Sequence, residues 1–326
     1  MVAEARAFWT TGPGRGAIRT TELAPLVPGT VLVETLYSGI SRGTETLVFL
    51  NRVPASQIQV MRCPFQEGAF PAPVKYGYAA VGRIVDGAAE DRDRHVFVLH
   101  PHQDRFVVPA AAAMPIPETV PPARAVLAAN VETALNGLWD SGIAAGDRVC
   151  VIGAGVVGLL VAWLASRIPA VNITLYDIDP LKEIYARRLA IPFQADPPER
   201  GDYDVVIHAS GNPAGLAYAL ALAGFEATIV EMSWYGDRSA VLPLGEDFHS
   251  RRLTIRSSQV GGIPAARRAR WPHRRRLETA MDLLNDPLLD ALISGESGFD
   301  ELPQVMAALA DGSMTALCHR IRYTRD

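Results

Sequence analysis

The sequence has few cysteines, no long apolar run and no strong excess of charge, and each absence excludes a class of protein. The cysteines Cys63, Cys150 and Cys318 are widely spaced, so they predict no disulfide framework and favour a reducing compartment, the cytoplasm. No stretch of about 18 apolar residues is free of charge, so no membrane span is expected. The net charge of −4 gives no reason to expect a nucleic acid as partner.

The first residues lack a basic region followed by an apolar one, so no secretory signal is expected. What is present is the composition of a globular protein. The chain has 326 residues, of which 49% are hydrophobic and 20% charged, enough for two domains with sizeable cores.

Beyond residue 120, apolar strands alternate with helices, which predicts a parallel sheet covered on both faces in a doubly wound α/β arrangement. The first 118 residues instead hold short strands separated by prolines and glycines, typical of an antiparallel, barrel-like domain. The expected strands are 30–34, 82–85, 95–99, 105–108, 148–152, 171–176, 203–209, 227–232, 253–257 and 316–323. The expected helices are 156–165, 181–189, 213–223, 275–284 and 301–310.

Residues 151–158 read Val-Ile-Gly-Ala-Gly-Val-Val-Gly, a glycine-rich turn between a predicted strand and a predicted helix. Gly153 permits the tight turn, Gly155 lets the backbone approach a pyrophosphate, and Gly158 lets helix and strand pack closely. The helix N-terminus then offers free amides to phosphate. The residues predicted to bind the cofactor are Gly153, Ala154, Gly155, Val156, Val157, Gly158, Asp177, Ser210 and Gly211. The alternative is a structural turn that holds no nucleotide.

Asp177 ends the next predicted strand, about 20 residues after the last glycine, at the spacing of the acid that binds a ribose. Its carboxylate can accept hydrogen bonds from the ribose hydroxyls, whereas it would repel a 2′-phosphate. The sequence therefore predicts NAD as the cofactor in preference to NADP.

Further segments resemble the medium-chain dehydrogenase/reductase superfamily, and the likeness covers nearly the whole chain. Residues 37–45 and 77–82 resemble the segments that carry the first and second catalytic-zinc ligands, and 210–212 resemble the loop beside the nicotinamide. The resemblance implies a GroES-like catalytic domain at 1–130 and 262–326 and a Rossmann domain at 131–261. It also implies alcohol–ketone chemistry on a small-molecule substrate, and a homodimer or homotetramer.

The chain departs from the metal pattern of that superfamily. Ser41 stands at the position of the cysteine ligand, Tyr78 replaces the histidine and Ala79 the glutamate. Glu132 is the remaining ligand position. Since zinc needs several thiolate or nitrogen ligands, the resemblance implies a zinc-free member and no metal site. Locally, residues 38–45 and Tyr78 resemble the bacteriochlorophyllide hydroxyethyl dehydrogenase subgroup, from which only the broad alcohol–ketone chemistry is taken.

Without zinc, a hydroxyl or ammonium group must polarise the substrate carbonyl. Tyr78 is the first choice because a phenol can donate a hydrogen bond or a proton. Its pKa would have to fall for acid–base work, and Lys75, three residues away, is the cation that could lower it. The alternative is that Tyr78 only fills the space of the metal. Ser41 and Thr44 would extend a proton relay, or else cap the backbone at a turn.

Glu45 and Glu132 lie in apolar or neutral segments, where burial would raise the pKa of a carboxyl and let it act as a base. Glu132 would equally cap the first Rossmann helix, which it is predicted to precede. His100 and His102 form a His-x-His pair that could ligate a metal, with a solvated turn as the alternative. His208, near the expected cofactor, is interpreted as a satisfied core histidine.

The arginines between 267 and 276 form the densest charge cluster, interpreted as a solvated helix start with Glu278 and Asp282 as partners rather than as an anion site. Trp234 and Tyr235 are expected to shape the substrate pocket or a subunit interface. Alternative functions are an NADPH-dependent quinone or enoyl reductase, a methyltransferase, and a nucleotide-binding module without catalytic activity.

Overall fold

The computed structural model describes residues 4–196 and 199–324, and the chain divides into two compact units. Residues 1–129 and 281–326 form the first unit, and residues 130–280 form the second. The prediction assigned 262–280 to the first of these, whereas the structure groups them with the second. Within this segment, Arg276 forms a buried ion pair with Glu132 of the second unit.

The second unit is built on a parallel sheet in the order β12-β11-β10-β13-β14-β15. The strands are β10 (Arg148–Ile152), β11 (Asn172–Tyr176), β12 (Phe193–Gln194), β13 (Tyr203–His208), β14 (Ala223–Glu231) and β15 (Thr254–Ser257). The chain moves outward from β10 in one direction and then in the other, which confirms the predicted doubly wound sheet. Predicted strand 148–152 and helix 156–165 match β10 and α4 at both ends.

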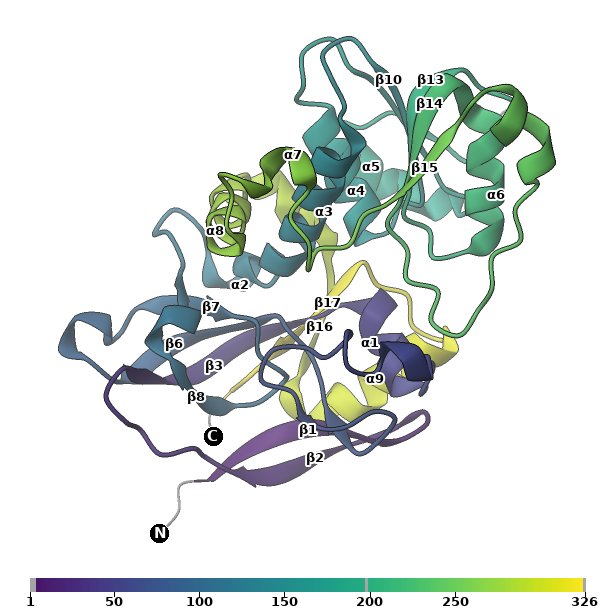
Figure 1. Ribbon diagram of the computed structural model, residues 1–326. Helices are drawn as coiled ribbons and strands as arrows, with labels where there is room; N and C mark the ends of the chain where they lie inside the picture. The colour runs from purple at the N-terminus through teal and green to yellow at the C-terminus, as the bar shows by residue number, and fades with distance from the viewer. Residues whose placement is uncertain (1–3, 197–198, 325–326) are drawn as a thin grey trace. The chain divides into compact units, whose positions relative to one another are not determined.

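Helices cover both faces of this sheet, as Figure 1 shows, with α4 and α5 on one face and α6 on the other. The helices are α3 (Ala128–Ser141), α4 (Val156–Ala165), α5 (Glu183–Arg188), α6 (Pro213–Leu222), α7 (Ala265–Arg268) and α8 (His273–Leu283). Val149, Cys150 and Val151 of β10 are completely buried, because a central strand covered on both faces has no solvent side.

The first unit holds two sheets, in the orders β2-β1-β5-β4 and β16-β17-β3-β6-β7-β9, with β8 also paired to β3. Its strands are β1 (Glu4–Gly12), β2 (Arg15–Glu22), β3 (Thr30–Ile40), β4 (Glu67–Gly68), β5 (Val74–Lys75), β6 (Ala80–Asp86), β7 (His95–Val98), β8 (Arg105–Pro109), β9 (Met114–Pro115), β16 (Ile293–Gly298) and β17 (Cys318–Arg322). All of their pairings are antiparallel except that of β16 with β17, in accord with the predicted barrel-like domain.

Helices α1 (Arg42–Phe49), α2 (Pro122–Ala125) and α9 (Leu302–Asp311) complete the first unit. The alternative to a proton relay placed Ser41 and Thr44 in a turn, whereas Ser41 precedes α1 and Thr44 lies inside it. The Glu45 carboxylate accepts the Ser41 amide at 2.7 Å, which satisfies one of the donors left free at a helix start. Within the described residues, no helix combines the length and the apolar character needed to cross a bilayer.

Candidate active site

The glycine-rich turn has the geometry predicted for each glycine. Gly153 has a φ of +106°, and a Cβ there would lie 2.6 Å from the Ser210 amide nitrogen. A Cβ on Gly158 would lie 1.8 Å from the carbonyl oxygen of Gly153, so only glycine allows this approach of α4 to the turn. A Cβ on Gly155 would meet no atom within 4 Å. The packing of the protein therefore does not explain why position 155 is a glycine.

Gly155 is also the N-cap of α4, and no side chain caps this helix end. The amides of Val156 and Val157 belong to the first turn of α4, so they are among the donors that a helix start leaves without intrahelical partners. The dipole of the helix adds a partial positive charge at the same place. The open approach at Gly155 and this uncapped helix start fit a pyrophosphate.

Asp177 directly follows β11 and is bound to the glycine-rich turn. Its Oδ2 accepts the Ala154 amide at 2.6 Å, and its Oδ1 accepts the Asp179 amide at 2.9 Å. Each carboxylate oxygen keeps a second lone pair, and the side chain is partly exposed. The predicted bonds from Asp177 to a ribose are thus compatible with its place in the protein, and they stay a prediction.

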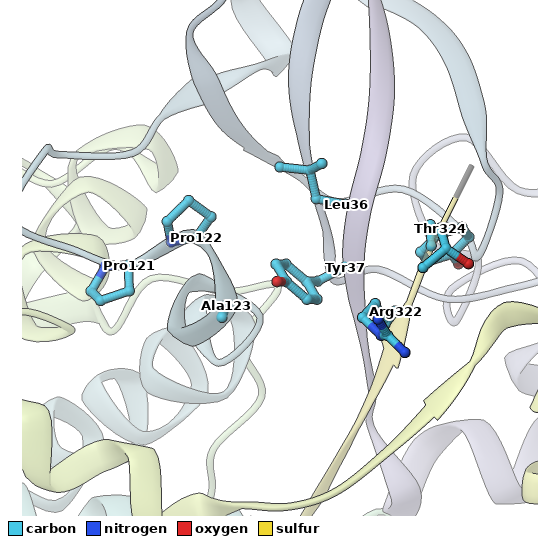
Figure 2. Close-up of a pocket in the computed structure, with 8 residues that line it drawn as sticks. Leu36, Tyr37, Pro121, Pro122, Ala123, Arg322 and Thr324 are labelled. Carbon is cyan, nitrogen blue, oxygen red and sulfur yellow. The ribbon is translucent and has the colours of Figure 1, made fainter. Parts of the chain in front are cut away.

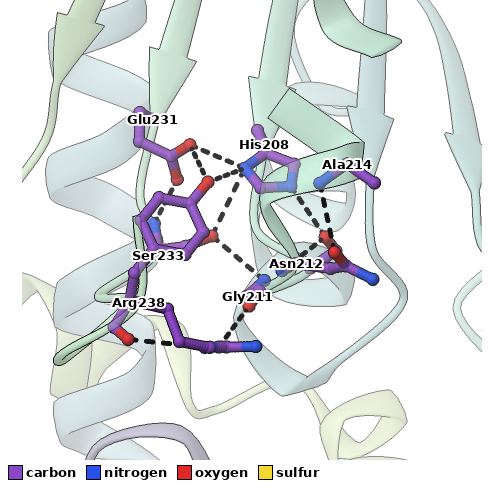
Figure 3. Close-up of polar contacts among 9 residues, drawn as sticks. His208, Gly211, Asn212, Ala214, Glu231, Ser233 and Arg238 are labelled. Carbon is purple, nitrogen blue, oxygen red and sulfur yellow. Dashed lines mark hydrogen bonds and ion pairs between the residues drawn. The ribbon is translucent and has the colours of Figure 1, made fainter. Parts of the chain in front are cut away.

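The loop at 210–212 follows β13 and is held by hydrogen bonds with the side chains of His208 and Ser233. The Ser210 hydroxyl lies 2.7 Å from His208 Nε2, and the Gly211 amide donates to the Ser233 hydroxyl at 3.1 Å. His208 is fully buried at 0% exposure, and its Nδ1 lies 2.7 Å from Glu231 Oε2. The prediction of a satisfied core histidine is therefore confirmed, and one of its partners, Ser210, lies on the loop predicted to bind the cofactor (Figure 3).

In the first unit, Tyr78 donates a hydrogen bond to the Ser41 hydroxyl at 2.7 Å. Burial, together with the negative charge of Glu45, raises the pKa of Tyr78 to about 12, although hydrogen bonds with Ser41 and Thr44 counteract part of the rise. The lowered pKa that acid–base work by Tyr78 would require is therefore not found. The three predicted catalytic hydroxyls, those of Tyr78, Ser41 and Thr44, do lie together.

Lys75 does not serve Tyr78 as the predicted cation. Its ammonium donates to Glu67 and to Gln103, both at 2.5 Å. The side chain is 1% exposed, and burial is the main cause that lowers its pKa. Lys75 is therefore a buried structural cation with partners of its own.

Glu45 lies beside His102, which the sequence analysis left as either a metal ligand or part of a solvated turn. Its Oε2 lies 2.8 Å from His102 Nε2, and His102 Nδ1 lies 2.7 Å from the Ser38 hydroxyl. Both His100 and His102 are buried, at 4% and 1% exposure. The alternative of a solvated turn is wrong for this histidine pair. The contact of Glu45 with His102 joins residues 57 positions apart, so local sequence carried no signal for it.

The donors at the expected zinc positions do not suit zinc. Ser41 and Tyr78 offer hydroxyl groups that are hydrogen-bonded to each other, and Ala79 offers no ligand. Zinc sites instead use thiolate, imidazole and carboxylate ligands. Among residues 4–196 and 199–324, no group of three or more His, Cys, Asp or Glu side chains could hold a metal ion.

Glu132 lies inside α3 rather than before it, so the capping prediction is wrong. Its Oε1 accepts Arg276 Nε at 3.0 Å. Burial raises the pKa of Glu132 despite the attraction of Arg276, which agrees with the predicted direction. The guanidinium of Arg276 also bonds Asn136 and the carbonyl of Val260, both at 2.5 Å.

The arginine cluster is only partly the solvated helix start that was predicted. Arg276 is 2% exposed, while Arg267 and Arg275 are exposed and stack on tryptophans. The Arg275 guanidinium carbon lies 3.9 Å from the Trp271 ring centroid, and that of Arg267 lies 5.0 Å from the Trp139 ring. The cluster thus covers two tryptophans with cations.

A pocket of about 300 Å³ lies in the first unit, between β3, α2 and the residues around β17 (Figure 2). Tyr37, Pro121 and Arg322 are among its lining residues. None of the residues predicted to act in catalysis lines it, so this pocket does not identify a substrate.

No protein-family model matches the sequence. An uncharacterized zinc-type alcohol dehydrogenase-like protein from Haemophilus influenzae is 24% identical over 245 residues, which cover 71% of this chain and 64% of that protein. The aligned part thus spans less than two thirds of the length of this relative.

Several solved structures are similar over their whole length. L-idonate 5-dehydrogenase from Escherichia coli has a TM-score of 0.80 at 16% identity, covering 99% of each chain. The 2R,3R-butanediol dehydrogenase from Bacillus subtilis has a TM-score of 0.77 at 17% identity, covering 98% of this chain and 99% of the other. A short chain alcohol dehydrogenase from E. coli complexed with NADH has a TM-score of 0.76 at 18% identity, covering 98% of this chain and 99% of the other.

The chain therefore has the fold of the medium-chain dehydrogenases, a Rossmann unit and a second, barrel-like unit. The Haemophilus influenzae relative is similar to this chain in sequence, and its name places it among the zinc-type alcohol dehydrogenase-like proteins.

Proposed function

We propose that the chain is an oxidoreductase that transfers a hydride between NAD(H) and a secondary alcohol or its ketone, without a catalytic zinc. The observation that carries the proposal is the open backbone at Gly155, where a Cβ would meet no protein atom within 4 Å. In this proposal the turn and the start of α4 bind the pyrophosphate, and Asp177 binds the adenosine ribose. A bound nicotinamide supplies or accepts the hydride.

The hydroxyl pair of Tyr78 and Ser41 is the proposed substitute for a metal. A pKa of about 12 keeps the phenol of Tyr78 protonated at neutral pH, so it acts as a donor to the substrate oxygen and not as a base. In the reducing direction the phenol can give its proton to the forming alkoxide, which is far more basic. The Ser41 hydroxyl accepts a hydrogen bond from the Tyr78 phenol and so orients it.

The nucleotide part is tested by fluorescence titration of the purified protein with NADH and with NADPH. We expect tight NADH binding and weak NADPH binding. Gly155→Ala should fold normally and lose about tenfold or more in NADH affinity, because the methyl group would occupy the space of the pyrophosphate. Gly245→Ala is the matched control, since a Cβ there also meets no atom within 4 Å. Binding of neither nucleotide would reject the proposal, and a preference for NADPH would favour a quinone or enoyl reductase.

The catalytic part is tested with a panel of ketones and alcohols in the presence of a metal chelator. Tyr78→Phe should lower kcat by about 100-fold or more with little change in KM, the usual loss when a positioned acid is removed. Tyr76→Phe is the control, because its buried hydroxyl bonds only the carbonyl of Met61 at 3.2 Å among the contacts described. Loss of turnover in the chelator would contradict zinc independence. Equal rates for both variants would remove Tyr78 from the mechanism.

A further inference from the structure

A hydrogen-bonded cluster lies at the carboxyl ends of β13 and β14, and the proposed reaction makes no use of it. Its centre is the contact of His208 with Glu231, called here the His208–Glu231 pair (Figure 3). The Tyr235 hydroxyl donates to Glu231 Oε2, and the Ser233 amide donates to Oε1, each at 2.6 Å. Both oxygens of the carboxylate are therefore held by donors in one fixed orientation.

The donors around Glu231 favour its charged form. Burial alone raises the pKa of Glu231, but the hydrogen bonds donated by His208, Tyr235 and Ser233 counteract burial, and the pKa is lowered. A neutral imidazole with its proton on Nδ1 donates to the carboxylate, while its Nε2 accepts from the Ser210 hydroxyl. The pair then carries one negative charge. The side chains of His208 and Glu231 are 0% and 12% exposed, so solvent screens this charge less than it would at the surface.

The pair lies next to the turn that is proposed to bind the cofactor. A Cβ on Gly153 would lie 2.6 Å from both the amide nitrogen and the Cα of Ser210, and Ser210 bonds His208. A doubly wound sheet binds one nucleotide in each half, outside the carboxyl ends of its strands. Asp177 follows β11 in one half, where the adenosine is expected. The half with β13 and β14, which carries the pair, is left for the nicotinamide.

We infer that Glu231 sets the relative affinity of the protein for the two oxidation states of the cofactor, favouring the oxidised form. The oxidised nicotinamide ring carries a positive charge and the reduced ring is neutral, so a fixed carboxylate attracts one and not the other. This inference rests on the proposed function, because it needs the nucleotide to bind at this turn. Arg238 is the other charge in the cluster; it donates to the Gly211 carbonyl at 2.7 Å and is exposed, so solvent weakens its field.

The test is the pair of dissociation constants for NAD⁺ and NADH, measured at pH 8 by calorimetry or by fluorescence. Glu231→Gln keeps the size of the side chain and removes its charge. We expect NAD⁺ affinity to fall by on the order of tenfold, while NADH affinity changes by less than about twofold. Glu226→Gln is the matched control, because Glu226 is an exposed carboxylate on the same strand, paired with Arg252 at 2.8 Å. It should leave both affinities unchanged.

One further variant separates charge from structure. Glu231→Asp keeps the charge and disturbs the hydrogen bonds, so its ratio of the two dissociation constants should stay near that of the wild type.

The outcomes distinguish this inference from the proposed function. A wild-type protein that binds neither form rejects the proposed function, and the inference falls with it. Binding of both forms with a ratio that Glu231→Gln changes by less than about twofold rejects the inference alone. A parallel loss of both affinities also rejects it, because that result marks Glu231 as a purely structural residue of the loop.

Discussion

The burial of His100 makes the stability of the first unit depend on pH. The imidazole is 4% exposed and stacks on Phe106, with ring centroids 3.8 Å apart. Burial lowers the pKa of His100 from 6.5 to about 3, although a hydrogen bond to the Pro101 carbonyl works in the opposite direction. In the folded protein the ring is therefore neutral at any pH near neutrality.

The direction of the effect follows from proton binding. The unfolded chain protonates this histidine below its ordinary pKa of 6.5, and the folded chain does so only near pH 3. Between these values the unfolded state binds more protons, so the contribution of His100 is complete above about pH 6.5 and is lost as the pH falls. For this residue alone, moving from pH 7 to pH 5 should lower the free energy of unfolding by about 2 kcal/mol.

The assay is urea unfolding at pH 7 and at pH 5, followed by hydrogen exchange of the β7 and β8 amides so that the first unit is observed. His100→Gln should shrink the difference between the two pH values by about 2 kcal/mol. His95→Gln is the control, because His95 is exposed on the neighbouring strand β7. If His100→Gln and the wild type lose equal stability between pH 7 and pH 5, the reasoning from burial is refuted.

Three further changes test other parts of the structure. Arg276→Gln should lower the free energy of unfolding by about 3–5 kcal/mol, because it leaves the buried Glu132 carboxylate without its cation. Thermal or urea denaturation measures this loss. The double variant Arg276→Gln with Glu132→Gln should lose less stability, because it removes the unpaired carboxylate as well. Gly158→Ala should destabilise the second unit by about 3 kcal/mol or more, since the new methyl would overlap the Gly153 carbonyl, and a thermal midpoint equal to the wild type would contradict this. All three cysteines are buried, and burial raises their pKa, to about 12 for two of them, so none should react with a thiol reagent at pH 8 until the protein is unfolded.

The local patterns of the sequence predicted the second unit well. The apolar strands, the glycine-rich turn and the helix follow one another within a few residues, and the local residue pattern of each element predicts its type. β10 and α4 therefore match their predicted bounds, and the roles of Gly153 and Gly158 follow from backbone geometry alone. Helix α1 was missed; at its start the Glu45 carboxylate reaches back to the Ser41 amide, a contact that composition does not reveal.

The errors at the candidate site come from contacts between distant residues. Lys75 is close to Tyr78 in sequence, but it lies on a strand, where direction and partners are set by the neighbouring strand and by Gln103. Tyr78 consequently meets hydroxyls and the field of Glu45, and its pKa rises instead of falling. The partner of Glu132 lies 144 positions away. No spacing rule predicts such pairs.

The order of the strands in the first unit has a consequence for how the protein is made. β17 pairs with β3 along residues 37–40 and 319–322, and the whole of the second unit is synthesised between these two strands. The second unit has all its strands and its own core before β17 leaves the ribosome. We therefore expect it to fold first on the nascent chain, while residues 37–40 of β3 still lack their β17 partner and are open to aggregation or to a chaperone.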